Sequence, residues 1–165
     1  MSVYKFKASI NGSKVFMREY EVKAGMSLYD FHEYLISDLD FAPDQMTLFR
    51  GLDIAGNIKS EYGLFDMGDG SMDSITIEDL LAKKEPVFQY VFDLRKDRFI
   101  LFTLIGEADE HPRHSYPRLT AEKGHNPDQF AKGYDDMEQF VESSVDMGDD
   151  EAIDDEELPE GEEYL

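Results

Sequence analysis

The sequence predicts an α+β domain in which a β-grasp-like ββαβ start is followed by a long aromatic β-hairpin and a C-terminal helix. Three patterns carry this prediction. Apolar residues alternate near the N-terminus, an amphipathic stretch follows them, and residues 87–105 form the most apolar and aromatic run of the chain. We expect residues 1–145 to form this single domain, and residues 146–165 to form an acidic disordered tail.

The N-terminal strands are predicted from period-two alternation. Residues 3–10 and 15–22 both alternate between polar and apolar side chains, which is typical of half-buried strands. The Asn-Gly-Ser-Lys segment between them, residues 11–14, has the composition of a tight turn. The apolar face consists of Tyr4, Phe6, Ala8, Ile10, Phe16, Tyr20 and Val22. These segments therefore predict a β-hairpin.

The next segment predicts a helix from Leu28 to Leu39. Ser27 is a suitable N-cap, and Asp30 three residues later gives a weak capping box. The apolar stripe consists of Leu28, Phe31, Leu35 and Leu39, with His32 and Ile36 beside it. Residues 45–50 predict a third strand. The glycine-rich residues 51–74 predict loops with one short extended piece near 62–65, and residues 75–81 predict a short strand that leads into a helical turn.

Residues 87–105 predict two long strands joined by a charged turn. In the first strand, one face consists of Phe88, Tyr90, Phe92 and Leu94, and these residues alternate with Val87, Gln89, Val91 and Asp93. The second strand is apolar on both faces, which favours a central strand covered on both sides. Residues 106–126 are polar and predict a loop, and residues 134–145 have the spacing of a helix that packs on the domain.

Composition restricts the class of function. The net charge is −21, and eleven of the 37 carboxylates lie in residues 146–165. Such a surface repels a phosphate backbone, so we expect no direct binding of nucleic acid. The chain has no Cys, which excludes disulfides and thiolate chemistry. With no signal peptide and no stretch of about 20 apolar residues, we expect a cytoplasmic protein that does not contact membranes.

Four segments carry motifs of a known family: VYKFKASINGSKVFMREYEV, SLYDFHEYL, FDLRKDRFILFTLIGE and YPRLTAEKGHNPDQFAKGYDDMEQF. They resemble the plasmid pRiA4b ORF-3-like family, whose bacterial and archaeal members have a poorly defined role. The resemblance implies the fold and an association with mobile elements. The chain departs from the motifs at the hairpin, where a Gly-Asp turn is replaced by residues 95–97, a Trp by Phe99 and a His by Leu101. It also departs at Leu119, where the motif has a Cys, and at residues 127–129, where it has Pro-Glu-Asp.

The segment from Asp109 to His114 is the candidate for metal chemistry. His111 and His114 lie three residues apart beside carboxylates, and these residue types can bind a divalent metal. Pro112 between them indicates a loop, so a solvated loop is the simpler interpretation. The acidic residues 66–73 do not fit the ligand spacing of an EF-hand. Neither a nucleophile elbow nor a P-loop is present, and we expect no cofactor.

The leading hypothesis is a non-catalytic protein-interaction module of this mobile-element-associated family. It would bind a protein partner through a sheet edge or the aromatic hairpin. The interaction candidates are His32, Tyr90, Arg95 and Phe99. Two alternatives remain open: a metal-dependent hydrolytic enzyme that uses residues 109–114, and an acidic nucleic-acid mimic whose tail, residues 146–165, binds a basic protein. The sequence does not predict an oligomeric state.

Overall fold

The computed structural model describes residues 2–130. Residues 2–12 and 16–130 belong to one compact unit, and only residues 13–15 of a second unit are described. The elements are β1 (Ser2–Ser9), β2 (Met17–Lys23), α1 (Leu28–Leu39), β3 (Leu48–Leu52), β4 (Ile58–Tyr62), α2 (Ile77–Ala82), β5 (Val87–Asp93), β6 (Arg98–Asp109) and β7 (Arg118–Lys123). The helix predicted for 134–145 and the tail predicted for 146–165 lie outside the described residues.

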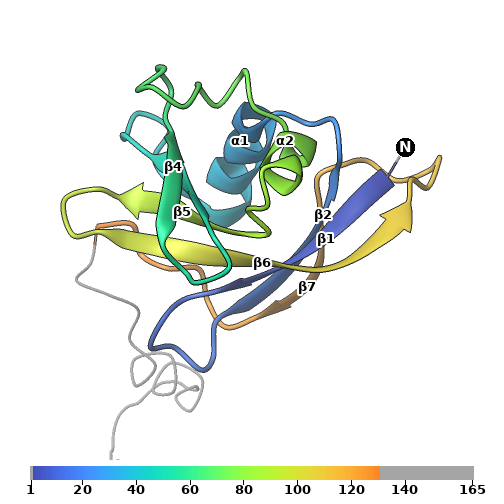
Figure 1. The fold of residues 1–165 in the computed structure, drawn as a ribbon. Coiled ribbons are helices and arrows are strands. Elements are labelled where there is room, and N and C mark those ends of the chain that lie inside the picture. Colours follow the sequence, from blue (N-terminus) through green and yellow to red (C-terminus); the bar gives the residue numbers. More distant parts are fainter. Residues whose placement is uncertain (1, 131–165) are drawn as a thin grey trace, which may run out of the picture. The chain divides into compact units, whose positions relative to one another are not determined.

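The strands form an antiparallel seven-stranded sheet with the order β4-β3-β5-β6-β1-β2-β7 (Figure 1). The α+β class, the order of the first four elements and both predicted hairpins are confirmed. Phe6 of β1 pairs with Tyr20 of β2 on one side and with Leu104 of β6 on the other. Strand β3 does not lie beside the N-terminal hairpin of β1 and β2, because β5 and β6 lie between them.

Both helices pack on the same face of the sheet (Figure 1). At the start of α1, Ser27 Oγ accepts a hydrogen bond from the backbone N–H of Asp30, as the sequence predicts. The Phe31 ring of α1 meets Phe49, Phe88 and Phe102 from three strands at centroid distances of 6.3, 6.4 and 5.3 Å. The apolar stripe of α1 therefore covers the aromatic residues of β3, β5 and β6.

Three segments differ from their prediction: β4 and β7 form where the sequence predicts loops, and β6 extends to Asp109. The helical turn predicted at the end of residues 75–81 is present as α2, which already begins at Ile77. A full capping box between Thr76 and Asp79 starts α2. Strands β4 and β7 lie at the two edges of the sheet, where polar side chains face solvent and conceal the alternation.

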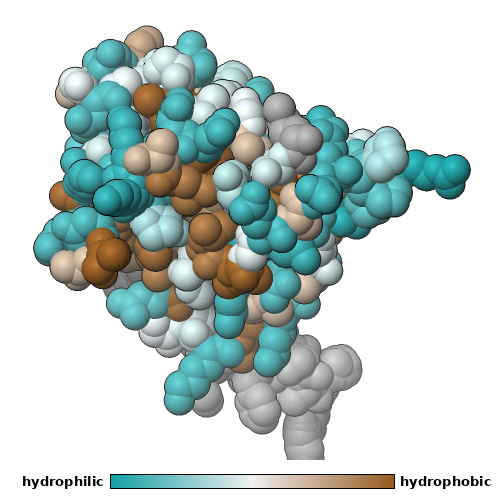
Figure 2. Space-filling view, turned by 45° about the vertical axis from the view of Figure 1, so that its right-hand side comes forward, coloured by the Kyte–Doolittle hydropathy of each residue, from teal (hydrophilic) through white to brown (hydrophobic). Residues whose placement is uncertain are grey.

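The outer face of β6 is only partly covered, so the prediction of a strand buried on both faces is wrong there. Ile100 and Phe102 point into the core and are fully buried, whereas Ile105 is 48% exposed. Apolar side chains also gather near the centre of one face of the molecule, with hydrophilic ones around them (Figure 2). None of the helices within residues 2–130 has the length and apolar character needed to cross a bilayer.

Candidate functional site

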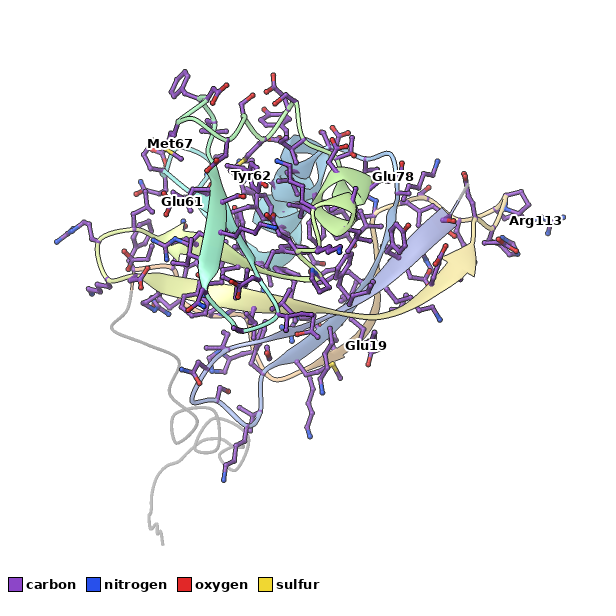
Figure 3. All side chains as sticks on the ribbon, in the orientation of Figure 1. Glu19, Glu61, Tyr62, Met67, Glu78 and Arg113 are labelled. Carbon is purple, nitrogen blue, oxygen red and sulfur yellow. The ribbon has the colours of Figure 1, made fainter. Side chains whose placement is uncertain are left out.

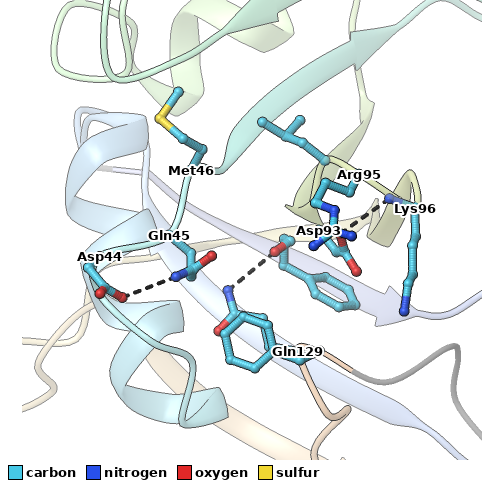
Figure 4. A pocket seen from close by; sticks show the side chains of 10 residues that line it. Asp44, Gln45, Met46, Asp93, Arg95, Lys96 and Gln129 are labelled. Atoms are coloured by element: carbon cyan, nitrogen blue, oxygen red, sulfur yellow. Dashed lines mark hydrogen bonds between the residues drawn. The ribbon is translucent and has the colours of Figure 1, made fainter.

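A cavity of about 480 Å³ lies beside the turn that joins β5 to β6. We call it the tip cavity. Figure 4 shows Arg95 and Lys96 on one side of it, and Asp44, Gln45 and Met46 on the other. Its lining consists of Asp44, Gln45, Met46, Phe92, Asp93, Leu94, Arg95, Lys96, Gln129 and Phe130. Three segments that are distant in the sequence therefore meet at this site.

The turn that carries Arg95 and Lys96 is fixed by its two flanking aspartates. The Asp93 carboxylate accepts a hydrogen bond from the backbone N–H of Lys96 at 3.2 Å. Asp97 adopts a left-handed conformation, with φ of 53°, and its Oδ1 accepts a hydrogen bond from Arg50 Nη1 at 2.7 Å. Asp tolerates this conformation better than most residues. Asp93 thus bonds within the turn, and Asp97 ties the turn to Arg50 of β3.

Two exposed cations, Arg95 and Lys96, lie in this turn of a strongly acidic chain, and the cavity lining also includes the carboxylates of Asp44 and Asp93. Arg95 and Lys96 are exposed, and neither side chain makes an ion pair or hydrogen bond with any residue in the described range. By contrast, Arg50 pairs with Asp97 and Glu61 beside the turn. Two cations are therefore available at the rim of the cavity for a ligand that carries negative charge.

The floor of the cavity is formed by Gln129, whose side chain is 5% exposed. Its Oε1 accepts a hydrogen bond from the Ala42 backbone N–H at 2.7 Å, and its Nε2 donates to the Phe92 carbonyl at 3.2 Å. The amide therefore joins the segment after α1 to the end of β5. A buried amide that makes two hydrogen bonds to the backbone gives the cavity a fixed base.

Arg98 also binds the segment that contains Gln129. Its Nη1 donates to the carbonyls of Asp128 and Gln129 at 2.8 and 3.2 Å. Its guanidinium lies 4.8 Å from the centroid of the Phe92 ring, and burial lowers the pKa of Arg98 below its ordinary value. This arrangement places Phe130, which follows directly, at the rim of the cavity.

Exposed apolar side chains surround the opening. Met46 and Phe130 are each 60% exposed, and Leu94 is 38% exposed. They come from three different segments and all line the same cavity. A site with apolar groups beside two exposed cations is suited to an amphipathic anionic ligand.

Two of the predicted interaction residues lie inside the protein. His32 is 3% exposed, and its Nδ1 lies 2.8 Å from the hydroxyl of Tyr90 and 3.3 Å from that of Thr47. Desolvation lowers the pKa of His32 and raises that of Tyr90. The pair joins α1 to β5 beneath the surface. Neither residue is placed to meet a partner in this structure.

The other two predicted residues lie apart from each other. Arg95 lines the tip cavity. Phe99 is half-buried on the outer face of β6, where it lies opposite Val91 of the neighbouring strand β5. The structure thus brings one of the four predicted interaction residues to the cavity. The sequence did not indicate Met46, because nothing local links it to the hairpin, and it marked Gln129 only as part of a departure from the family motif.

Of the candidate metal residues, Asp109 ends β6, and His111 and His114 lie in the connection between β6 and β7. The rings of His111 and His114 stack at a centroid distance of 4.1 Å, and His111 Nδ1 accepts a hydrogen bond from the Arg113 N–H at 3.1 Å. Glu110 pairs with Lys23 at 2.9 Å. Within residues 2–130 no group of three His, Asp or Glu side chains is arranged to hold a metal. Two imidazoles are thus brought together without a third ligand.

Arg18 is a structural residue that sequence reasoning missed. It is 2% exposed, and its guanidinium donates to the carbonyls of Lys123 and Gly124 and to Asn126 Oδ1, at 2.8, 3.1 and 2.8 Å. Its position two residues after Phe16 in an alternating strand placed it on the buried face. Arg18 therefore anchors the segment that continues to the floor of the tip cavity.

The comparisons with known proteins agree with this architecture. The sequence pattern of the family described as "Plasmid pRiA4b ORF-3-like protein" matches residues 2–162. The structure is similar to the crystal structure of MM3350 from Methanosarcina mazei Go1, a protein of unknown function. The TM-score is 0.64 at 17% identity, with 76% of this chain and 71% of that chain covered. No curated protein matches.

Proposed function

The chain belongs to the plasmid pRiA4b ORF-3-like family, and on this premise we propose that it is a non-catalytic protein-interaction module that binds its partner at the tip cavity. The observation that carries the proposal is the pair of exposed cations Arg95 and Lys96, which have no ion-pair partner among residues 2–130, beside exposed apolar side chains. The association with mobile elements is part of the same proposal.

The cavity favours a partner segment that combines an apolar anchor with carboxylates. A volume of about 480 Å³ is within the range of ligand sites and can accept one or two large side chains. Met46, Leu94 and Phe130 offer apolar contacts around the opening. The two cations would attract carboxylates and orient the segment. We therefore propose an acidic and apolar peptide segment as the ligand.

The two edges of the sheet are less suited than the tip cavity to binding a partner. At β4, the backbone N–H of Glu61 already donates to Asp69 Oδ2 at 3.0 Å. At β7, the register shifts opposite Glu19 and Tyr20, and the Leu119 N–H donates to the Tyr34 hydroxyl at 3.0 Å. Bulges and capped edge groups hinder the addition of another strand. This contrast favours the tip over an edge.

The proposal is tested with a peptide library displayed on phage and selected against the full chain. Peptides with an apolar residue next to Asp or Glu should be enriched. Their affinity should fall about tenfold or more in Arg95→Glu/Lys96→Glu, because both rim charges are reversed. Lys7→Glu/Lys123→Glu makes the same change of charge at two other exposed lysines and should leave the affinity unchanged. Selected peptides that bind the tip variant as tightly as the wild type would refute the proposal.

A further inference from the structure

The loop after β4 presents apolar side chains to solvent. Phe65 is 76% exposed, Met67 is 54% exposed and Leu64 is 36% exposed. They belong to the segment Leu64–Asp73, which we call the 64–73 loop. Figure 3 shows Met67 close to the end of β4 that carries Glu61 and Tyr62. Large apolar residues that gather on one exposed loop are typical of a contact surface.

Hydrogen bonds of Asp66 and of the backbone brace the loop. Asp66 Oδ1 accepts hydrogen bonds from the backbone N–H groups of Gly68 and Gly70 at 2.8 and 3.1 Å. Both glycines have positive φ, at 124° and 116°. At the base of the loop, the Met72 N–H donates to the Gly63 carbonyl at 2.8 Å. A loop that is fixed before binding loses little conformational entropy when it docks.

The loop is also strongly acidic. It carries Asp66, Asp69 and Asp73, and residues 60–82 contain no Lys or Arg. The 64–73 loop thus combines an exposed aromatic residue with nearby carboxylates. This is the chemistry that the tip cavity would recognise, and no residue of the loop lines that cavity in its own chain.

We propose that the 64–73 loop of one copy docks in the tip cavity of a second copy, an inference that rests on the function proposed above. The Phe65 ring enters among Met46, Leu94 and Phe130. The carboxylates of the loop face Arg95 and Lys96. The two surfaces belong to different parts of the chain, so the contact is heterologous and each copy offers one loop and one cavity.

The association is expected to be weak and dependent on concentration. A net charge of −21 makes two copies repel each other at long range. At physiological ionic strength charges separated by more than about 8 Å are largely screened, so the contact between loop and cavity decides the outcome. The measurement is therefore made at that ionic strength.

The test is sedimentation velocity of the full chain over a concentration series. Three variants are compared with the wild type: Phe65→Ser removes the loop anchor, Arg95→Glu/Lys96→Glu removes the cavity charges, and Ile54→Ser is a control. Ile54 is 94% exposed and lies in a different turn, so its replacement removes apolar surface elsewhere. We expect Ile54→Ser to associate like the wild type. The other two variants should each weaken association about tenfold or more.

Mixing the two defective variants provides the decisive measurement. Phe65→Ser retains an intact cavity and the tip variant retains an intact loop, so an equal mixture should form a 1:1 complex that neither variant forms alone. No complex in the mixture, or association of either variant like the wild type, would overturn the inference. If the wild type stays monomeric while phage-selected peptides still require Arg95 and Lys96, the inference fails and the proposed function stands.

Discussion

Glu85 lies against the backbone of Gly51, so that a Cβ built on residue 51 would lie 2.0 Å from Glu85 Oε1. The carboxylate is fully buried. Its Oε2 accepts a hydrogen bond from Ser60 Oγ at 2.9 Å, and its Oε1 accepts one from the Tyr62 hydroxyl at 3.0 Å. One side chain therefore joins β3 and β4 to the segment before β5. Only glycine at position 51 leaves room for this contact.

Replacing Gly51 by Ala should destabilise the protein. The new methyl group would displace the Glu85 carboxylate, and the carboxylate cannot move without losing its partners Ser60 and Tyr62. We expect the free energy of unfolding to fall by about 2–3 kcal/mol, measured by urea denaturation followed by circular dichroism. Gly106→Ala is the control, because a Cβ there would lie 3.7 Å from Lys5 Cδ, an ordinary contact. Equal losses in the two variants would contradict the explanation.

The buried His32 predicts a pH-dependent stability. Desolvation lowers its pKa from the ordinary value of 6.5, although Glu33 opposes this shift. As the pH falls below about 6.5, the unfolded chain binds a proton at His32 that the folded chain does not bind. The folded state therefore loses stability from about pH 6.5 downward, and this contribution is fully retained above that pH.

The measurement is urea denaturation of the wild type and His32→Gln at about pH 7.5 and about pH 5. The wild type should lose more stability between these values, since the variant lacks the titrating group. Tyr90→Phe serves as a second comparison, because it removes the hydroxyl that lies 2.8 Å from His32 Nδ1 but keeps the imidazole. It should be less stable than the wild type and still depend on pH. The idea is wrong if His32→Gln shows the same loss as the wild type.

The parts of the fold that the sequence predicted are those with a strong local pattern. The aromatic face of β5 and the apolar stripe of α1 are both buried, so period and composition agree there. Strand β7 has the sequence RLTAEK, in which only Leu119 and Ala121 are apolar. Strand β7 forms because it pairs with β2, and its own residues show little preference for a strand.

The candidate site was less predictable than the fold. Arg95 was visible as a departure from a family motif. Gln129 was part of another such departure, but neither departure indicated that Met46, Arg95 and Gln129 meet at the tip through contacts across more than 30 residues of sequence. The buried Arg18 follows the period-two rule, but its charge argued against a core position. Long-range partners of polar side chains leave no local pattern in a single sequence.

Gln129 provides a test of how the floor of the cavity is held. Truncation in Gln129→Ala leaves the Ala42 N–H and the Phe92 carbonyl without their partner. We expect a loss of about 1–3 kcal/mol in the free energy of unfolding and faster hydrogen exchange of the Ala42 amide. Gln45→Ala removes an exposed amide of the same cavity and should change stability little. Unchanged exchange at Ala42 would show that the amide does not fix the floor.

The exposed edge strand β4 is capped by Asp69, whose Oδ2 accepts the Glu61 N–H at 3.0 Å. Edge strands with free N–H groups template pairing with other chains, so Asp69→Ala should raise the rate of aggregation while the unfolding free energy changes little. Thioflavin T fluorescence and light scattering during incubation measure this. Asp73→Ala loses the same charge nearby, and Asp69→Asn keeps an acceptor oxygen, so both should aggregate as slowly as the wild type. If Asp69→Ala and Asp73→Ala aggregate equally, loss of charge explains the effect and the cap does not.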